Sequence, residues 1–209
     1  MSTKKRLILL GAGGQGRVAA DVAVCMGAYR EVCFLDDGLC GGDTDLPYRV
    51  PGGFSDFPSY MEEADFLVSL GQNAARRRWQ ETLEAAGASM ATLIHPRAVV
   101  AERVTIGVGS VVMAGAVINP DAVIGRGVII NTCASVDHDG RIGDFCHISV
   151  GAHLAGTVTV GANSLLGVGV AVRPGVTIGA DCTVGVGAAV VNDLTEPGVY
   201  VGVPARRMK

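Results

Sequence analysis

The second half of the chain carries an aliphatic residue at every sixth position, from Ile94 to Val190, without an exception. Helices and hairpins do not have a period of six, but a strand that turns a corner after every six residues does. Glycine also recurs every eighteen residues, at positions 107, 125, 143, 161 and 179. Three hexapeptides therefore form one geometric unit, and the sequence predicts a triangular coil of stacked short strands.

The composition suits a coil of this kind. From Val104 onward, the residue two positions before each aliphatic residue is small or apolar. Aromatic residues make up only 5% of the chain and there are 30 glycines, which fits flat strands and tight turns better than a bulky core. The formal net charge of -3 argues against a nucleic acid or an anionic membrane as the main partner.

The cysteines and the N-terminus indicate the compartment. The six cysteines form no C-x-x-C pair and have no metal-like spacing, so we expect no metal and predict free, buried thiols in a reducing cytosol. Cys146 and Cys182 fall at inward positions of the repeat. Lys4, Lys5 and Arg6 precede an apolar run of only four residues, too short for a signal peptide or a membrane span. We therefore expect a cytoplasmic protein without membrane insertion.

Residues 1–92 have a different sequence pattern from residues 93–209, which predicts that the two segments form separate domains. Alternating strand and helix patterns indicate a small parallel sheet of the Rossmann-like βαβ type. The expected elements are strands at Leu7–Leu10, Glu31–Leu35 and Phe66–Leu70, a helix at Val18–Met26 closed by Gly27, and a helix with Asn73 as N-cap that runs to Gly87. Residues 38–61 are expected to form a loop around one short strand near Tyr48.

A glycine-rich loop follows the first expected strand. Gly11, Gly13 and Gly16 match G-x-G-x-x-G, and Asp36 lies twenty residues after Gly16. This pattern is typical of a phosphate bound at a helix N-terminus, with an acidic residue on a ribose or base. The domain is too short for two mononucleotide-binding halves, which favours a mononucleotide or nucleotide sugar over NAD(P) or a purely structural turn.

His138 is the strongest candidate for chemistry. It lies at an expected corner between Asp137 and Asp139, with Pro120 one coil before it and Gly156 one coil after it. A carboxylate beside an imidazole raises its basicity and can fix its tautomer, as a general base requires, although a turn histidine between two turn-favouring aspartates is the alternative. Of the other histidines, His147 is a candidate ligand contact that points out of the coil wall, and His95 and His153 are expected to be structural and solvated respectively.

These residues resemble a known family, the bacterial nucleotide-amino-sugar N-acetyltransferases of the PglD/NeuD-like hexapeptide group. The resemblance extends over essentially the whole chain. It rests on the segments 11–16, 34–37 and 70–73, on 130–139 with its Val136-Asp137-His138-Asp139 ending, on 145–152, and on the C-terminal Val201-Gly202-Val203-Pro204-Ala205-Arg206.

The resemblance implies a left-handed parallel β-helix, a homotrimer with active sites between subunits, and acetyl-CoA as donor without a metal. It implies His138 as general base, Asp139 as its carboxylate partner and Gly156 as an oxyanion-stabilising amide. His147, Val168 and Val186 would contact coenzyme A. The nucleotide-linked sugar would be bound by Gly13, Gly14, Gln15, Asp36, Asp37, Gly71 and Asn131.

Two residues depart from the family pattern. Gln15 stands where close members often have histidine, and Asp139 stands where they have glutamate, so either Asp137 or Asp139 could orient the imidazole. The expected reaction is acetylation of a UDP-linked 4-amino-deoxy sugar for glycan synthesis. The alternatives are a GDP- or dTDP-amino sugar, O-acetylation of a sialic-acid-type sugar, and a nucleotide-binding β-helix scaffold without catalysis. A covalent route through Cys133 or Cys146 is a further rival, and the basic C-terminal tail could pair with coenzyme A phosphates or be solvated.

Overall fold

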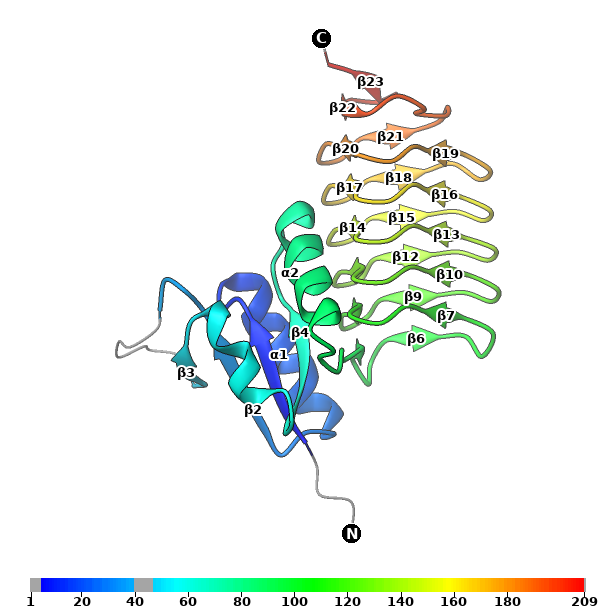
Figure 1. Cartoon of the computed structure of the whole chain (residues 1–209). Helices are drawn as coiled ribbons and strands as arrows, with labels where there is room; N and C mark the ends of the chain where they lie inside the picture. The colour runs from blue at the N-terminus through cyan, green and yellow to red at the C-terminus, as the bar shows by residue number, and fades with distance from the viewer. Residues whose placement is uncertain (1–4, 40–46, 209) are drawn as a thin grey trace. The chain divides into compact units, whose positions relative to one another are not determined.

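The computed structural model describes residues 5–39 and 47–208 (Figure 1). The chain divides into two compact units, one ending at Pro96 and the other beginning at Arg97. Lys4, Cys40 and Lys209 lie outside the described residues. Among the helices of the described ranges, none is both long and apolar enough to cross a membrane.

The first unit is built on a parallel sheet with the strand order β3-β2-β1-β4. Its strands are β1 (Arg6–Leu10), β2 (Glu31–Leu35), β3 (Arg49–Gly52) and β4 (Ala64–Val68), and its helices are α1 (Gly14–Met26) and α2 (Asn73–Ala85), with the short β5 (Leu93–Ile94) at its end. Leu7 to Leu10 are fully buried, as a central parallel strand covered on both faces requires. Gly27 closes α1 in the left-handed conformation at φ 61°, as predicted.

The structure corrects several details of this unit. The expected loop at 38–61 contains a 3₁₀ helix, η1 (Phe54–Tyr60), which forms because Phe57 is buried in the core while Asp56 accepts a hydrogen bond from the Gly53 N–H. Gln72, not Asn73, is the N-cap of α2, since the Asn73 side chain instead accepts a hydrogen bond from Arg76. Helix α2 also ends before the predicted Gly87, and β4 begins two residues earlier than expected.

The second unit is the predicted coil of stacked strands, arranged in three sheets whose strands run parallel, except that the last strand pairs antiparallel with its neighbour (Figure 1). One sheet contains β7 (Thr105–Ile106), β10 (Val123–Ile124), β13 (Arg141–Ile142), β16 (Thr159–Val160) and β19 (Thr177–Ile178). A second contains β6 (Val99–Val100), β9 (Val117–Ile118), β12 (Ser135–Val136), β15 (His153–Leu154), β18 (Ala171–Val172) and β21 (Ala189–Val190). The third contains β8 (Val111–Val112), β11 (Ile129–Ile130), β14 (His147–Ile148), β17 (Leu165–Leu166), β20 (Cys182–Val184), β22 (Gly198–Val201) and β23 (Arg206–Arg207).

The six-residue period has two structural consequences. Every sixth aliphatic residue from Val112 to Val190 is buried, whereas Val100 and Ile106 are only partly buried because β6 and β7 are the first strands of their sheets. The corners also recur every six residues and take the left-handed conformation. Asp121, Cys133, Asp139, Phe145, Thr157, Asn163 and Asp181 do so at φ 55–63°, and glycines fill the other such corners.

The free-thiol prediction is only partly right. Cys33, Cys146 and Cys182 are buried, and burial raises the pKa of Cys33 to about 11, with the hydrogen bond to Glu31 adding to the effect. Cys25 and Cys133 are instead exposed. Cys25 lies on the outer part of α1 and Cys133 lies at a corner of the coil, so neither joins a core.

The eighteen-residue glycine column is explained by contact between coils. A Cβ atom at Gly143 would lie 2.6 Å from the Ala162 nitrogen in the next coil, and one at Gly107 would lie 2.5 Å from the Arg126 nitrogen. Neither glycine has a positive φ, so the requirement is one of space. Glycine at these positions lets successive coils approach closely.

We expect Gly143→Ala to destabilise the second unit. Forcing a methyl group against backbone costs about 1–3 kcal/mol, which lowers Tm by several degrees in a protein of this size. Gly151→Asn is the matched control, because a Cβ there meets nothing within 4 Å and Asn163 already takes the same corner conformation. Thermal unfolding followed by circular dichroism measures both. Equal melting of Gly143→Ala and wild type would contradict the packing explanation.

Candidate functional site

His138 lies at the corner between β12 and β13, next to the carboxylate that contacts its ring. Nδ1 of His138 is 2.8 Å from Oδ2 of Asp139, and both side chains are 58% exposed. Asp139 takes the left-handed corner position at φ 58°, a conformation in which aspartate is enriched. The shorter aspartate therefore does reach the imidazole, and the ring contact is made by Asp139 and not by Asp137.

Asp137 holds the backbone of the same corner. Its Oδ1 accepts hydrogen bonds from the backbone N–H of His138 and from Nδ2 of Asn119, each at 2.7 Å. The Asn119 hydrogen bond, followed by that of the His138 N–H, lowers the pKa of Asp137. Asp137 consequently remains ionised and contributes negative charge beside the imidazole.

The two carboxylates make His138 more basic. The hydrogen bond that the His138 ring donates to Asp139 raises the pKa of His138 above its usual value, desolvation opposes this, and the charges of Asp137 and Asp139 add to the increase. A neutral imidazole that donates its Nδ1 proton to Asp139 keeps Nε2 as the free acceptor. The corner therefore presents Nε2 as the atom able to take a proton.

Gly156 lies directly over this ring, one coil further along the chain. The Thr157 N–H donates to the carbonyl oxygen of His138 at 2.9 Å, and a Cβ atom at position 156 would collide with Nε2 of His138. Gly156 is buried, and its N–H has no acceptor within the part of the chain that the structure describes. A side chain at position 156 would occupy the space beside Nε2, so the present position of the ring requires glycine there.

The residues expected to contact coenzyme A lie along another part of the coil. His147 is in β14, and its Nε2 is 3.0 Å from Nδ2 of Asn131, whose Oδ1 accepts the Thr132 N–H at 2.8 Å. Val168 and Val186 follow β17 and β20 in the same sheet and are 46% and 78% exposed. This sheet differs from the two that flank His138, so a single subunit does not bring the two groups together.

The glycine-rich loop of the first unit leaves the N-terminus of α1 open. Gly11 follows β1 at φ 105°, and a Cβ atom at Gly16 would collide with its carbonyl oxygen. Gly13, Gly14 and Gly71 are exposed, and a Cβ atom at any of them would meet nothing within 4 Å. Unblocked backbone N–H groups at a helix N-terminus are a site for phosphate.

The predicted acidic residues around this loop are engaged by backbone groups. Asp36 accepts the N–H of Ala12 at 2.8 Å and that of Gly38 at 2.9 Å, and Asp37 accepts the N–H of Phe54 at 2.7 Å. Gln15 differs, because its Nε2 is buried with no hydrogen-bond partner among the described residues. An orphaned amide donor beside the open helix end could serve a ligand oxygen.

No role for Arg76 was predicted from the sequence. It is 1% exposed, and its Nη1 donates to the Leu70 oxygen at 2.9 Å and to the Gly71 oxygen at 3.3 Å. It thereby shapes the loop that carries Gly71. The available signal was the spacing of Asn73 and Arg76, which places the two side chains on one face of a helix, where they form a 2.8 Å hydrogen bond.

The remaining candidate residues do not contact His138. Cys146 is buried and its Sγ donates to the Gly161 oxygen at 3.1 Å, while Cys133 lies at the corner between β11 and β12, a different corner from His138. His153 is exposed and contacts Oγ of Ser135 at 2.9 Å. In the tail, Arg207 donates to the Pro197 oxygen at 2.6 Å.

A hexapeptide coil with a carboxylate-paired imidazole at a corner, in one chain with a glycine-rich βαβ unit, defines a hexapeptide-type acyltransferase. Residues 6–83 match the family model of the PglD N-terminal domain. The chain is 40% identical, with a TM-score of 0.94, to the acetyltransferase domain of PglB from Neisseria gonorrhoeae FA1090 in complex with acetyl coenzyme A. It is 38% identical, with a TM-score of 0.91, to PerB from Caulobacter crescentus in complex with CoA and GDP-perosamine. These alignments cover 98% and 97% of the chain, and 100% and 97% of the two structures.

A further relative is the UDP-N-acetylbacillosamine N-acetyltransferase of Bacillus subtilis (strain 168). It is 35% identical over 112 residues, which are 53% of this chain, and the match spans only about half, 52%, of the relative's length. The chain belongs to the PglD family of nucleotide-sugar N-acetyltransferases.

Proposed function

We propose that the protein transfers the acetyl group of acetyl-CoA to the amino group of a nucleotide-linked amino sugar. The observation that carries this proposal is the His138–Asp139 pair with Nε2 facing the bare Gly156. Supporting it, one similar structure holds acetyl coenzyme A, and another holds CoA with GDP-perosamine. The acceptor is then a sugar amine and the donor a thioester.

In this mechanism, Nε2 of His138 removes a proton from the amine as its nitrogen attacks the thioester carbon. General-base help of this kind typically contributes about 10²–10⁴-fold. Asp139 stabilises the imidazolium that forms, and the Gly156 N–H donates to the oxyanion of the tetrahedral intermediate. Collapse of the intermediate breaks the carbon–sulfur bond, and the proton held by His138 passes to the departing thiolate.

The remaining assignments belong to the same proposal. His147, Val168 and Val186 contact coenzyme A, and Asn131 orients His147 and faces the sugar. Gly13, Gly14, Gln15, Asp36, Asp37 and Gly71 hold the nucleotide in the domain formed by residues 1–92. Because His138 and the coenzyme-binding sheet are apart within one chain, a homotrimer joins them at sites between subunits.

We propose a UDP-linked 4-amino-deoxy sugar as acceptor, with GDP- and dTDP-amino sugars as the alternatives. The relative from Bacillus subtilis is named for a UDP sugar, whereas PerB binds GDP-perosamine. Thiol release from acetyl-CoA, measured in parallel with each amino sugar and with a sialic-acid-type hydroxyl acceptor, should be fastest with the UDP-amino sugar. Faster thiol release with the GDP sugar would overturn the nucleotide assignment. If none of the acceptors caused thiol release, the result would support only a non-catalytic scaffold.

The hydrogen bond between His138 and Asp139 should affect how kcat/KM depends on pH. Catalysis requires neutral His138, so kcat/KM falls as pH drops through the pKa of His138, which Asp139 holds raised. Asp139→Asn removes the main cause of the raised His138 pKa, so the acidic limb of the kcat/KM profile shifts to lower pH. At the plateau kcat falls, because the ring is less well oriented. The measurement is kcat/KM from pH 5 to 9. An acidic limb that stays in place would show that Asp139 does not tune the base.

A further inference from the structure

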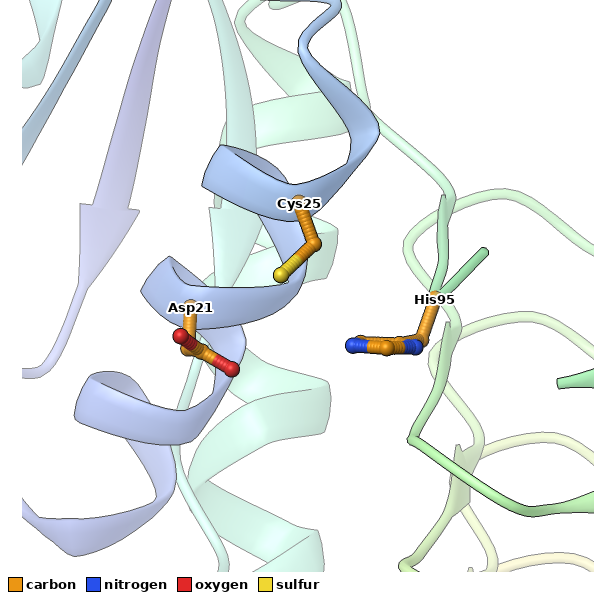
Figure 2. A group of neighbouring side chains, drawn as sticks. All are labelled: Asp21, Cys25 and His95. Atoms are coloured by element: carbon orange, nitrogen blue, oxygen red, sulfur yellow. The ribbon is translucent and has the colours of Figure 1, made fainter. Parts of the chain in front are cut away.

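Three metal-ligand side chains converge in the first unit, away from the glycine-rich loop. Asp21 and Cys25 lie on α1, and His95 follows β5. One carboxylate oxygen, the Sγ atom and one imidazole nitrogen all lie within 4.8 Å of one another. Figure 2 shows the His95 ring pointing toward the part of α1 that carries the other two side chains.

The fold explains why residues so distant in sequence meet. Asp21 and Cys25 are four residues apart in a helix, so their side chains share one face. Strand β5 packs against α1, and the residue that precedes a proline is restricted to extended backbone, which limits the freedom of His95 before Pro96. His95 is buried, whereas the two helical ligands are exposed and can adjust.

We propose that Asp21, Cys25 and His95 bind a divalent transition-metal ion, and that Zn²⁺ is the best fit. Thiolate and imidazole ligands suit zinc, while Mg²⁺ and Ca²⁺ prefer oxygen ligands only. Zinc bonds of about 2.0–2.3 Å place tetrahedral ligand atoms roughly 3–4 Å apart, so small side-chain rotations suffice to close the present spacing. A water molecule completes the fourth position.

Binding has two physical consequences. The Cys25 thiol gives up its proton as the zinc–sulfur bond forms, so metal affinity rises with pH. The ion also links α1, whose first turn carries the glycine-rich loop, to the segment that follows β5, and it therefore stabilises the first unit against unfolding. This inference does not depend on the acetyltransferase assignment, since it uses no residue of that proposal.

The test is a titration of the full-length, metal-free protein with Co²⁺ followed by Zn²⁺. We expect one ion per chain, a thiolate-to-cobalt charge-transfer absorption that zinc displaces, and a higher Tm with zinc than with chelator. Cys25→Ser should abolish the charge-transfer absorption, and Asp21→Asn should weaken zinc binding by tenfold or more. Both positions are exposed, so these variants retain the fold.

Cys133→Ser is the matched control, because Cys133 is an exposed thiol of the second unit that lies outside this cluster. It should retain full cobalt absorption and the full zinc effect on Tm. Absence of a thiolate–cobalt absorption in the wild type would overturn the proposal. So would absorption that survives Cys25→Ser or is lost in Cys133→Ser.

Discussion

His138→Ala is expected to lower kcat by about 10²–10⁴-fold, the usual contribution of a general base, while acetyl-CoA binds within a few-fold of normal. The imidazole is removed from the corner, but the residues proposed to hold the coenzyme lie in another sheet. Because His138 is more than half exposed, its loss leaves no cavity in the core. Steady-state kinetics and calorimetric titration with acetyl-CoA measure the two quantities separately.

The control for this variant is His153→Ala, since His153 is also an exposed histidine on the coil surface, but its ring contacts the Ser135 hydroxyl and not a carboxylate among the described residues. It should keep near-normal turnover. Near-normal turnover in His138→Ala would refute the assignment of the base. A large loss of acetyl-CoA affinity in that variant would instead make His138 a binding residue.

Gly156→Ala is the second substitution with a large expected effect. The new methyl group collides with Nε2 of His138, so the ring must turn away from Asp139 or lose access to the amine. We expect kcat to fall at least 10²-fold even though the backbone N–H at position 156 is retained. The Tm of the variant, measured alongside, separates this effect from unfolding.

A double-mutant cycle shows whether Gly156 acts through the ring. If it does, Gly156→Ala should cost little further activity in the His138→Ala background, because the group it obstructs is already absent. Losses that multiply across the two substitutions would contradict this explanation. They would show that position 156 serves catalysis independently of the imidazole.

The coil was predictable because each of its constraints is local and repeats. An inward side chain such as Val136 returns every six residues, and glycines such as Gly143 mark each contact between coils. The apolar run that became β1 and the glycine that closes α1 are equally local signals. The position of Gly156 over His138 also followed from counting one coil.

What the sequence did not predict depends on contacts between distant residues. The hydrogen bond that assigns Asp139 to the ring depends on a left-handed corner, which a sequence with aspartate on both sides of His138 does not specify. The buried Arg76 lies in a helix whose polar pattern suggests solvent exposure. The meeting of Cys25 with His95 requires the packing of β5 on α1, so cysteine spacing alone gave no indication of it.

The proposed acetyl transfer can be followed with an isotope-labelled acetyl carbon. Wild-type protein is mixed with labelled acetyl-CoA and a UDP-linked 4-amino-deoxy sugar, and the products are analysed by mass spectrometry and NMR. We expect the label to appear as an amide on the sugar nitrogen, with one coenzyme A thiol released for each amide. Acetyl transfer to a sugar amine would be refuted if no nucleotide-linked amino sugar received the label, or if the label appeared on a sugar hydroxyl.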